Sequence, residues 1–440
     1  MGTTYLHPNA GFIYPGSANY HAQKWEPAPL GDDGVRHLRD LAKTVADIAA
    51  EPKYAQKKRQ WQSHNDLRSN PKRPMYVCYA ENGWSDLIGD ETLKTEPPFW
   101  RLYEWYLLHL IYRHKNIDDD FVVPGELACF ADCGIENPSY GLSTVYSSVP
   151  ETGACVKTPF LSDYSDIKKM KMPAFWLDEK TTKARHGALC EVFGGILEVK
   201  TYITANFSAN QPGTLADLLG IEPMMLAMYE APGFLHELLE FVTLGNLKVF
   251  DEMEKSGHVR SNIGNFYVDS GGNGFSGIME TAGGGDAFGD MWGFGVAQEF
   301  SEVSPEFHYE FGVKYQRRVM ERFGVNSYGC CEPYTHKFDM LKKYVPKLRR
   351  ISVSSWCDAS KAAEQLKEGY IVSLKPNPAV LLYENDRQAV KNYIKKLLED
   401  TYNCTVELFL KDIISLKNRE RNFTDSAKII KESIDEVYNT

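Results

Sequence analysis

Helical and strand-like segments alternate regularly from about residue 300 to the C-terminus. Short runs rich in β-branched and apolar residues predict strands over 325–329, 351–354, 370–374 and 405–410. The segments between and beside them predict helices over 306–322, 337–344, 359–367, 385–399 and 426–437. Repeated strand–helix units indicate an α/β protein with a parallel sheet covered by helices. Their number and short connections favour a closed (β/α)8 TIM barrel over an open sheet.

The N-terminal half alternates less regularly. Residues 1–30 are rich in Pro, Gly, Tyr and Asn and predict an irregular arm, which a helix over 34–50 follows. Strands are predicted over 73–79, 121–123, 127–130, 202–207 and 265–269, and helices over 98–113, 181–199 and 215–255. No linker divides the chain. We therefore expect an N-terminal helical extension over 1–70, packed on a single barrel over 71–440.

Charge and composition exclude several classes of protein. The chain of 440 residues carries 49 basic and 59 acidic residues, a net charge of −10, and no long basic run, so we expect no nucleic-acid partner. Apolar residues make up 43% but never run for about 18 positions, which predicts a sizeable core and no membrane span. The nine scattered cysteines and the absence of a secretory signal pattern favour the reducing cytoplasm.

Reactive side chains are concentrated at the end of the strand over 325–329. The segment Tyr328-Gly-Cys-Cys-Glu-Pro333 places Cys330, Cys331 and Glu332 just before the next helix. The carboxyl ends of parallel strands are where ligands bind and chemistry takes place. Since side chains alternate along a strand, we expect only one of the two cysteines to face a pocket, while the other packs as a small apolar residue. We predict Cys331 and Glu332 as catalytic residues.

Atoms that suit zinc gather near the same strand end. The neighbouring strand, about 4.8 Å away, is followed by Trp356-Cys357-Asp358, so its side chains can converge with those of Glu332. Thiolates, carboxylates and an imidazole are accepted zinc ligands. A lone histidine near a helix start, such as His336, is more often a cap or a surface residue. The candidate metal ligands are Cys330, Cys331, Glu332, Cys357 and His336.

Charged residues follow other predicted strands. Lys411 and Asp412 end the strand over 405–410, where a lysine can neutralise a substrate carboxylate and an aspartate can orient it. Lys375 ends the preceding strand, and Asp269 is a candidate acid or base. Glu299 is a further candidate pocket residue. A salt bridge on the rim, a helix cap or a surface position explains each of these residues equally well.

Aromatic residues near the proposed strand ends are candidates for substrate binding. Tyr328, Trp292 and Trp356 lie in or beside predicted strands and loops. Aromatic faces bind aromatic or cationic ligands. Packing in the core accounts for such residues just as well.

Two segments of the chain resemble the uroporphyrinogen decarboxylase superfamily. Residues 217–232, followed by Phe234-Leu-His-Glu-Leu-Leu239, are similar to its helix–Pro–helix run, and Lys375-Pro-Asn-Pro-Ala-Val-Leu-Leu382 stands at a characteristic strand end. The resemblance implies a (β/α)8 barrel with a deep pocket at the carboxyl ends of its strands. The decarboxylase itself carries an Arg-Gln-Ala-Gly-Arg motif near the first strand. Residues 73–84 lack that motif, which argues against porphyrinogen chemistry.

A second branch of the superfamily contains methyltransferases of corrinoid-dependent systems. Several bind zinc through a His-x-Cys pair and a later cysteine. In this chain, residues 328–331 stand at the position of the His-x-Cys pair, and Lys411-Asp412 stands at the position of the later cysteine. Cys404 precedes the predicted strand over 405–410, so we expect it at the opposite end of that strand. The set of zinc ligands typical of these enzymes is therefore incomplete. The segments 298–305 and 329–333 resemble a subgroup associated with corrinoid methyl transfer. The resemblance implies a small methylated substrate and a partner corrinoid protein.

Three functions are therefore open. The leading hypothesis is a methyltransferase or demethylase that acts with a corrinoid protein, because the chain has no corrinoid-binding Asp-x-His-x-x-Gly motif of its own. The second is a cofactor-free decarboxylase or lyase that acts on a small carboxylated substrate through Lys375, Lys411 and Asp269. The third is a binding protein that keeps the barrel without catalysis. A homodimer is compatible with each.

Overall fold

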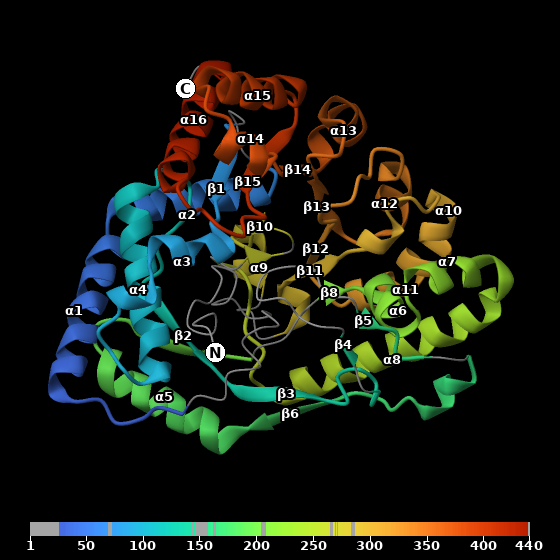
Figure 1. The fold of residues 1–440 in the computed structure, drawn as a ribbon, viewed down its shortest axis with the longest axis horizontal. Coiled ribbons are helices and arrows are strands. Elements are labelled where there is room, and N and C mark those ends of the chain that lie inside the picture. Colours follow the sequence, from blue (N-terminus) through green and yellow to red (C-terminus); the bar gives the residue numbers. More distant parts are fainter. Residues whose placement is uncertain are drawn as a thin grey trace.

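A parallel sheet lies at the centre of a mixed α/β fold (Figure 1). The computed structural model describes residues 26–68, 73–142, 145–146, 157–161, 164–203, 208–264, 267–268, 270, 272–282 and 287–438. Within these ranges the sheet has seven strands. In spatial order they are β1 (Met75–Cys78), β15 (Thr405–Leu410), β14 (Ile371–Leu374), β13 (Leu348–Val353), β12 (Val325–Tyr328), β11 (Trp292–Gly295) and β8 (Ser208–Ala209).

Every pairing in this sheet is parallel, so the carboxyl ends of its strands meet at one edge. A helix follows each of the strands β12 to β15 and covers the sheet (Figure 1). These helices are α12 (Phe338–Tyr344), α13 (Ala359–Leu366), α14 (Pro378–Tyr383), α15 (Arg387–Asp400) and α16 (Glu420–Tyr438). The helix predicted over 306–322 is present as α10 (Pro305–His308), a π-helical turn (Tyr309–Val313) and α11 (Lys314–Met320). The strand–helix alternation predicted after residue 300 is confirmed.

The N-terminal half packs helices against a second pair of strands. Helix α1 (Asp32–Ala49) lies on α4 (Pro98–Asn116) and α5 (Glu179–Phe193). Strands β2 (Glu126–Phe130) and β7 (Glu198–Tyr202) form a separate parallel pair. The long helical stretch predicted over 215–255 is divided into α6 (Gln211–Leu219), α7 (Ile221–Glu230) and α8 (Pro232–Lys255).

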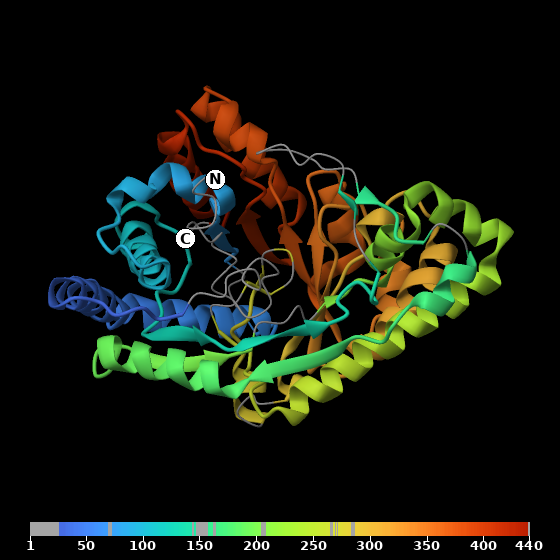
Figure 2. The ribbon, with the colours of Figure 1, turned by 60° about the horizontal axis from the view of Figure 1, so that its bottom comes forward.

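A long antiparallel ribbon, absent from the sequence predictions, crosses this half of the molecule. Strands β3 (Asp132–Glu136) and β6 (Ala174–Asp178) pair along their whole length, and Figure 2 shows them running beside α8. The amide of Phe175 donates to Glu252 of α8 at 2.7 Å, and Lys248 of α8 donates to the Pro173 carbonyl at 2.8 Å.

The other α-helices and strands of the described residues are α2 (Pro52–Asn65), α3 (Trp84–Leu87), α9 (Gly277–Ala282), β4 (Val145–Tyr146), β5 (Lys157–Thr158), β9 (Tyr267–Val268) and β10 (Gly272–Asn273).

Closure of the sheet into a barrel is not confirmed by the described strands. In the main sheet, β1 and β8 are the two edges, and β2 and β7 pair only with each other among the described residues. Parts of the strands predicted over 202–207 and 265–269, and most of the arm predicted over 1–30, lie outside the described residues. Within the described part of the chain, no helix is both long and apolar enough to cross a bilayer.

Two carboxylates, rather than a strand over 121–123, cover the edge of β1, and that strand prediction was wrong. The backbone N–H of Asp120 donates to the Tyr76 carbonyl at 2.9 Å, and its side chain accepts from the Tyr76 N–H at 2.9 Å. Asp119 accepts from the Cys78 N–H at 2.9 Å and from Arg113 at 2.5 Å. Polar groups on a sheet edge need partners when they are buried, and these carboxylates supply them.

The inner face of the sheet carries a buried ionic cluster. Glu407 of β15 contacts the Nε of Arg350 of β13 at 2.9 Å and the Nε2 of His64 at 3.3 Å. Ser373 of β14 donates to the same carboxylate at 2.5 Å. Asn65, at the end of α2, accepts from Arg350 at 2.9 Å, which ties the N-terminal helices to the sheet. All five side chains are essentially inaccessible to water.

This cluster determines how Glu407 ionises. Burial alone would raise its pKa, but Arg350, His64 and Lys375 outweigh burial and lower the pKa to about 2. The carboxylate is therefore charged at every pH at which the protein is expected to fold. A buried charge of this kind is tolerated only while its partners stay in place.

We predict that Glu407→Gln lowers the free energy of unfolding by about 3–5 kcal/mol, because Arg350 is left buried without its counter-charge. The loss is measured by urea denaturation at neutral pH. The folded-state pKa of Glu407 lies below its ordinary value of 4.5. Its contribution to the free energy of unfolding is therefore fully present above pH 4.5 and is lost as the pH falls toward 2.

The matched control is Glu436→Gln, which removes an exposed carboxylate paired with Lys391 on the surface. It should leave the urea midpoint nearly unchanged, because an ion pair exposed to water contributes little to stability. Equal effects of the two substitutions would contradict the role assigned to Glu407.

Candidate functional site

The turn after β12 requires a glycine. Gly329 has a φ of 98°, in the left-handed region that side chains disfavour. A Cβ added there would lie 2.4 Å from the ring of Tyr334. The backbone can therefore reverse closely over Tyr334 and present Cys330 and Cys331 beyond the end of the strand.

Glu332 holds this turn in place. One carboxylate oxygen accepts from the Ala297 N–H at 3.2 Å and from the Tyr334 hydroxyl, and the other accepts from the Cys330 N–H at 3.0 Å. Burial raises the pKa of Glu332, against the hydrogen bonds that lower it. The carboxylate thus fixes the backbone of Cys330 to the neighbouring loop, so Glu332 is a positioning residue in this arrangement.

The thiols of the two cysteines that follow β12 lie beside the lysine and the aspartate that follow β15. The Sγ atoms of Cys330 and Cys331 are 3.5 Å apart, and the Nζ of Lys411 lies 3.9 Å from the Sγ of Cys330. Asp412 contacts Lys411 at 3.0 Å and the Sγ of Cys331 at 3.9 Å. The structure therefore brings together four residues that the sequence predicted as site residues.

This contact also shows that the sheet is strongly curved. Strands β12 and β15 are separated by β13 and β14, three strand spacings or roughly 14 Å in a flat sheet. Side chains at the two strand ends nevertheless lie within 3.9 Å of each other. The inner face of the sheet is thus a concave surface, and the four residues lie at its carboxyl end.

The cluster makes Cys331 the more acidic thiol. Its pKa is lowered, first by the hydrogen bond from Cys330 and then by the positive charge of Lys411, which together outweigh burial. The pKa of Cys330 is raised, by the same hydrogen bond and by burial. Burial would lower the pKa of Lys411, but the two cysteines, Asp412 and Glu81 raise it overall, so its ammonium stays charged. Cys331 is therefore the thiol of the pair that ionises first.

A cavity of about 440 Å³ opens beside Cys331. It lies between the loops that follow β11, β12 and β13. The residues that line it are Gln298, Ser301, Glu302, Cys331, Glu332, Pro333 and Trp356. Cys330 is absent from this lining, so Cys331 faces the cavity while Cys330 lies beneath it against Lys411.

The predicted zinc ligands do not form a site in this arrangement. Cys357 accepts from the Tyr334 N–H at 3.3 Å and faces its own turn, and His336 is exposed. The ammonium of Lys411, rather than a third ligand, adjoins the thiol of Cys330. Among the described residues, no three His, Cys, Asp or Glu side chains are grouped to hold a metal ion. The residues present therefore do not fit a tetrahedral zinc ion.

Two predicted substrate-binding aromatics pack in the core. Trp292 begins β11 at the amino end of the sheet, is 1% exposed, and lies under the guanidinium of Arg350 at 4.4 Å. The hydroxyl of Tyr328 donates to Gln316 at 2.7 Å and lies 2.9 Å from the ring of His308, between the sheet and its helices. Neither side chain lines the cavity, which corrects their predicted role.

The other predicted residues are divided between the cavity and the interior. Trp356 is 77% exposed and lines the cavity, and Glu299 lies close enough to Glu332 to raise its pKa. Lys375 points inward, donates to Ser373 at 2.6 Å and lies over the ring of Phe409. Asp269 lies outside the described residues.

Several residues that support the site were missed from the sequence. Ser352 donates to the Cys330 carbonyl at 2.8 Å, Ser270 donates to the Gly329 carbonyl at 3.1 Å, and Glu81 accepts from the Ile413 N–H at 3.1 Å. The alternation in Ser352-Val-Ser354 at a strand end is a signal that could have identified Ser352. Glu302, three residues after the candidate pocket residue Glu299, lines the cavity.

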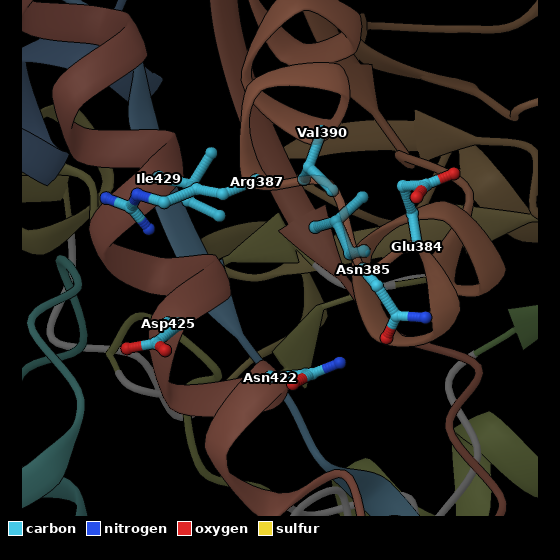
Figure 3. Close-up of a pocket in the computed structure, with 8 residues that line it drawn as sticks. Glu384, Asn385, Arg387, Val390, Asn422, Asp425 and Ile429 are labelled. Atoms are coloured by element: carbon cyan, nitrogen blue, oxygen red, sulfur yellow. The ribbon is translucent and has the colours of Figure 1, made fainter.

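Two further hollows lie away from these residues. One, of about 130 Å³, lies between the α14–α15 region and α16 (Figure 3), and its lining includes Arg387 and Asp425 but no predicted site residue. The other, of about 640 Å³, includes Cys404 at the amino end of β15. Cys404 thus lies at the end of the strand opposite Lys411, as predicted.

Comparisons with known proteins add little to this description. No family model matches the chain, and no curated protein matches it. Among solved structures, a methyltransferase from Methanosarcina mazei is similar over 87% of this chain and 99% of its own, with 12% identity and a TM-score of 0.49. At this identity and TM-score, an activity does not carry over from one chain to the other.

We predict that Cys331 reacts with iodoacetamide faster than Cys330, with a pH profile whose midpoint lies below the ordinary thiol pKa of 9.0. Lys411→Met should raise this midpoint and slow labelling at neutral pH, because the stabilising positive charge is gone. Labelling is followed by mass spectrometry of the peptides. Cys190, half-buried on α5, is the internal control and should label at the same rate in both proteins. An unchanged Cys331 profile in Lys411→Met would contradict the thiolate assignment.

Proposed function

We propose that the protein is a methyltransferase or demethylase that moves a methyl group between a small methylated compound and the corrinoid of a partner protein. The observation that carries the proposal is the acidic thiol of Cys331, which contacts Cys330 and Asp412 at the carboxyl end of the parallel strands and is open to the cavity, while Lys411 contacts Cys330. The resemblance of the sequence to corrinoid-dependent methyltransferases supports the same activity.

Each residue of the cluster has a distinct task in this proposal. Cys331 contacts the methylated compound, and its negative charge and polarisable sulfur face the carbon that is transferred. Lys411 keeps the thiol ionised, and Asp412 fixes the position of the lysine ammonium. Glu332 holds the turn, as its three hydrogen bonds indicate. A preorganised set of charges of this kind stabilises charge changes in the transition state.

The proposal includes a closed (β/α)8 barrel. The contact between residues at the ends of β12 and β15 requires a strongly curved sheet, which supports closure. Strands β2 and β7, parallel to each other, are the candidates to fill the gap between β1 and β8. In such barrels the active site lies at the carboxyl ends of the strands, where Cys331 and Lys411 are found.

The corrinoid would be presented by the partner. When bound there, it supplies a cobalt centre that takes up or gives up a methyl group. The rim of the site offers an exposed apolar side chain for such a partner: Ile414, two residues after Asp412, is 73% exposed. Exposed apolar residues beside a site are common where proteins dock.

A cofactor-free decarboxylase or lyase is the second candidate. The observation that favours it is the pair of buried lysines, Lys375 and Lys411, at the ends of neighbouring strands, since ammonium groups can bind a substrate carboxylate. Lys375, however, is engaged with Ser373 below the cavity. Turnover of a carboxylated compound without metal or corrinoid would select this candidate.

We predict that Cys331→Ser lowers the rate of methyl transfer to a corrinoid protein by about 100-fold or more, the effect expected when a preorganised charge is removed from a reaction centre. The melting temperature should be nearly unchanged, because Cys331 is only half-buried. Transfer of an isotopically labelled methyl group measures the rate.

Cys190→Ser is the control, because it removes a half-buried thiol from α5, away from the site, and should leave transfer unchanged. A large fall in the melting temperature of Cys331→Ser would instead show a packing residue. Stabilisation of the wild type by methylated compounds without any turnover would support a binding protein and contradict catalysis.

A further inference from the structure

The cavity beside Cys331 has an exposed tryptophan on one wall. Trp356 is 77% exposed, although its backbone is held by a hydrogen bond from its N–H to the Ser354 hydroxyl at 3.4 Å. Large aromatic side chains are usually mostly buried, so an exposed indole at the mouth of a cavity indicates a binding role. The face of an indole attracts cations more strongly than any other side-chain ring.

The cavity also presents negative rather than positive charge. Its lining contains two carboxylates, Glu302 and Glu332, together with the thiol of Cys331, and among the described residues that line it there is no lysine or arginine. Lys411 lies beneath, with 6% of its side chain accessible and its charge paired with Asp412.

Two neighbouring basic residues, His336 and Lys337, do not line the cavity. Partial desolvation of its ring and the nearby Lys337 ammonium lower the pKa of His336, the basic residue close to Glu302, below its ordinary value of 6.5, so its imidazole is mainly neutral at neutral pH. Lys337 is fully buried under the loop, where it donates to the carbonyls of Phe300 and Ser301. It fixes the segment that carries Glu302 instead of lining the cavity.

We propose that this cavity binds a small methylated cation, a sulfonium or quaternary ammonium compound, as the methyl donor. The indole of Trp356 lies against the cationic head, and the carboxylate of Glu302 and the thiolate of Cys331 balance its charge. This inference rests on the proposed methyl transfer and narrows it to one class of substrate. A cavity of about 440 Å³ is large enough for such a head group and a short side chain.

The bond changes balance for this class of donor. The bond between the methyl carbon and the sulfonium or ammonium centre breaks, and the carbon leaves without the electron pair. The reduced, nucleophilic corrinoid of the partner would supply the electron pair of the new bond to that carbon. The electron pair stays on sulfur or nitrogen, so the leaving group is a neutral sulfide or amine. It needs no proton, which suits a site in which the Glu332 carboxylate already accepts three hydrogen bonds.

Binding can be tested without turnover. Isothermal titration of the whole protein would compare choline with 3,3-dimethylbutan-1-ol, its neutral isostere, and trimethylsulfonium with tetramethylammonium. We expect choline to bind about tenfold more tightly than the isostere, in line with a desolvated cation–π contact. The second pair identifies which cationic centre fits better. Equal binding of choline and the isostere would overturn the proposal.

Substitutions test how much Trp356 and Glu302 contribute to choline binding. Trp356→Leu and Glu302→Gln should each weaken choline binding about fivefold or more, and Trp356→Phe should restore part of the loss, since phenylalanine keeps an aromatic face. Tyr229→Leu removes an aromatic side chain of similar exposure, 76%, from α7 and is the control. Unchanged choline binding in Trp356→Leu would exclude the indole as the cation site.

Different results would reject the proposed methyl transfer and the proposed cationic substrate class. Selective cation binding without methyl transfer to any corrinoid protein would keep the cation site and reject the proposed function. Methyl transfer from a neutral methoxylated compound, without selective binding of cations, would keep the function and reject the substrate class.

Discussion

The fold depends on a carboxylate buried inside the sheet. Glu407 is charged and inaccessible to water, and such a group is stable only with partners that neutralise it. Those partners come from three places: Arg350 from β13, Ser373 from β14 and His64 from the end of α2. The cluster therefore fixes the N-terminal helices, the curvature of the sheet and the relative positions of three strands at once.

The candidate site lies above this cluster on the same concave face. Side chains on one face of a strand recur at every second residue, so Glu407 and Lys411 point the same way from β15. The strand that holds the buried carboxylate in the core thus leads directly into the lysine that contacts the thiol of Cys330. A change at the cluster would shift the lysine relative to the thiols, which couples the stability of the core to the chemistry at the strand ends.

The sequence predicted the strands and helices after residue 300 because their hydrophobic patterns are regular and their turns are short. It also placed Cys331, Lys411 and Asp412 among the candidate site residues, because each follows a predicted strand. It could not predict to which face of the sheet the Tyr328 side chain points. A parallel strand is buried on both faces, so its hydrophobic pattern does not distinguish one face from the other. The role of Glu332 depends on the Ala297 N–H from a separate loop, a contact that no local pattern reveals.

The measurement that tests the account most directly is a titration of thiolate absorbance in the ultraviolet, on the wild type and on Cys331→Ser. We predict that the wild type has one more ionised thiol than the variant at a pH below the ordinary thiol pKa of 9.0, and that this difference disappears at acid pH. Identical titrations of the two proteins would mean that Cys331 is not ionised by Cys330 and Lys411, and would contradict the chemistry assigned to the site.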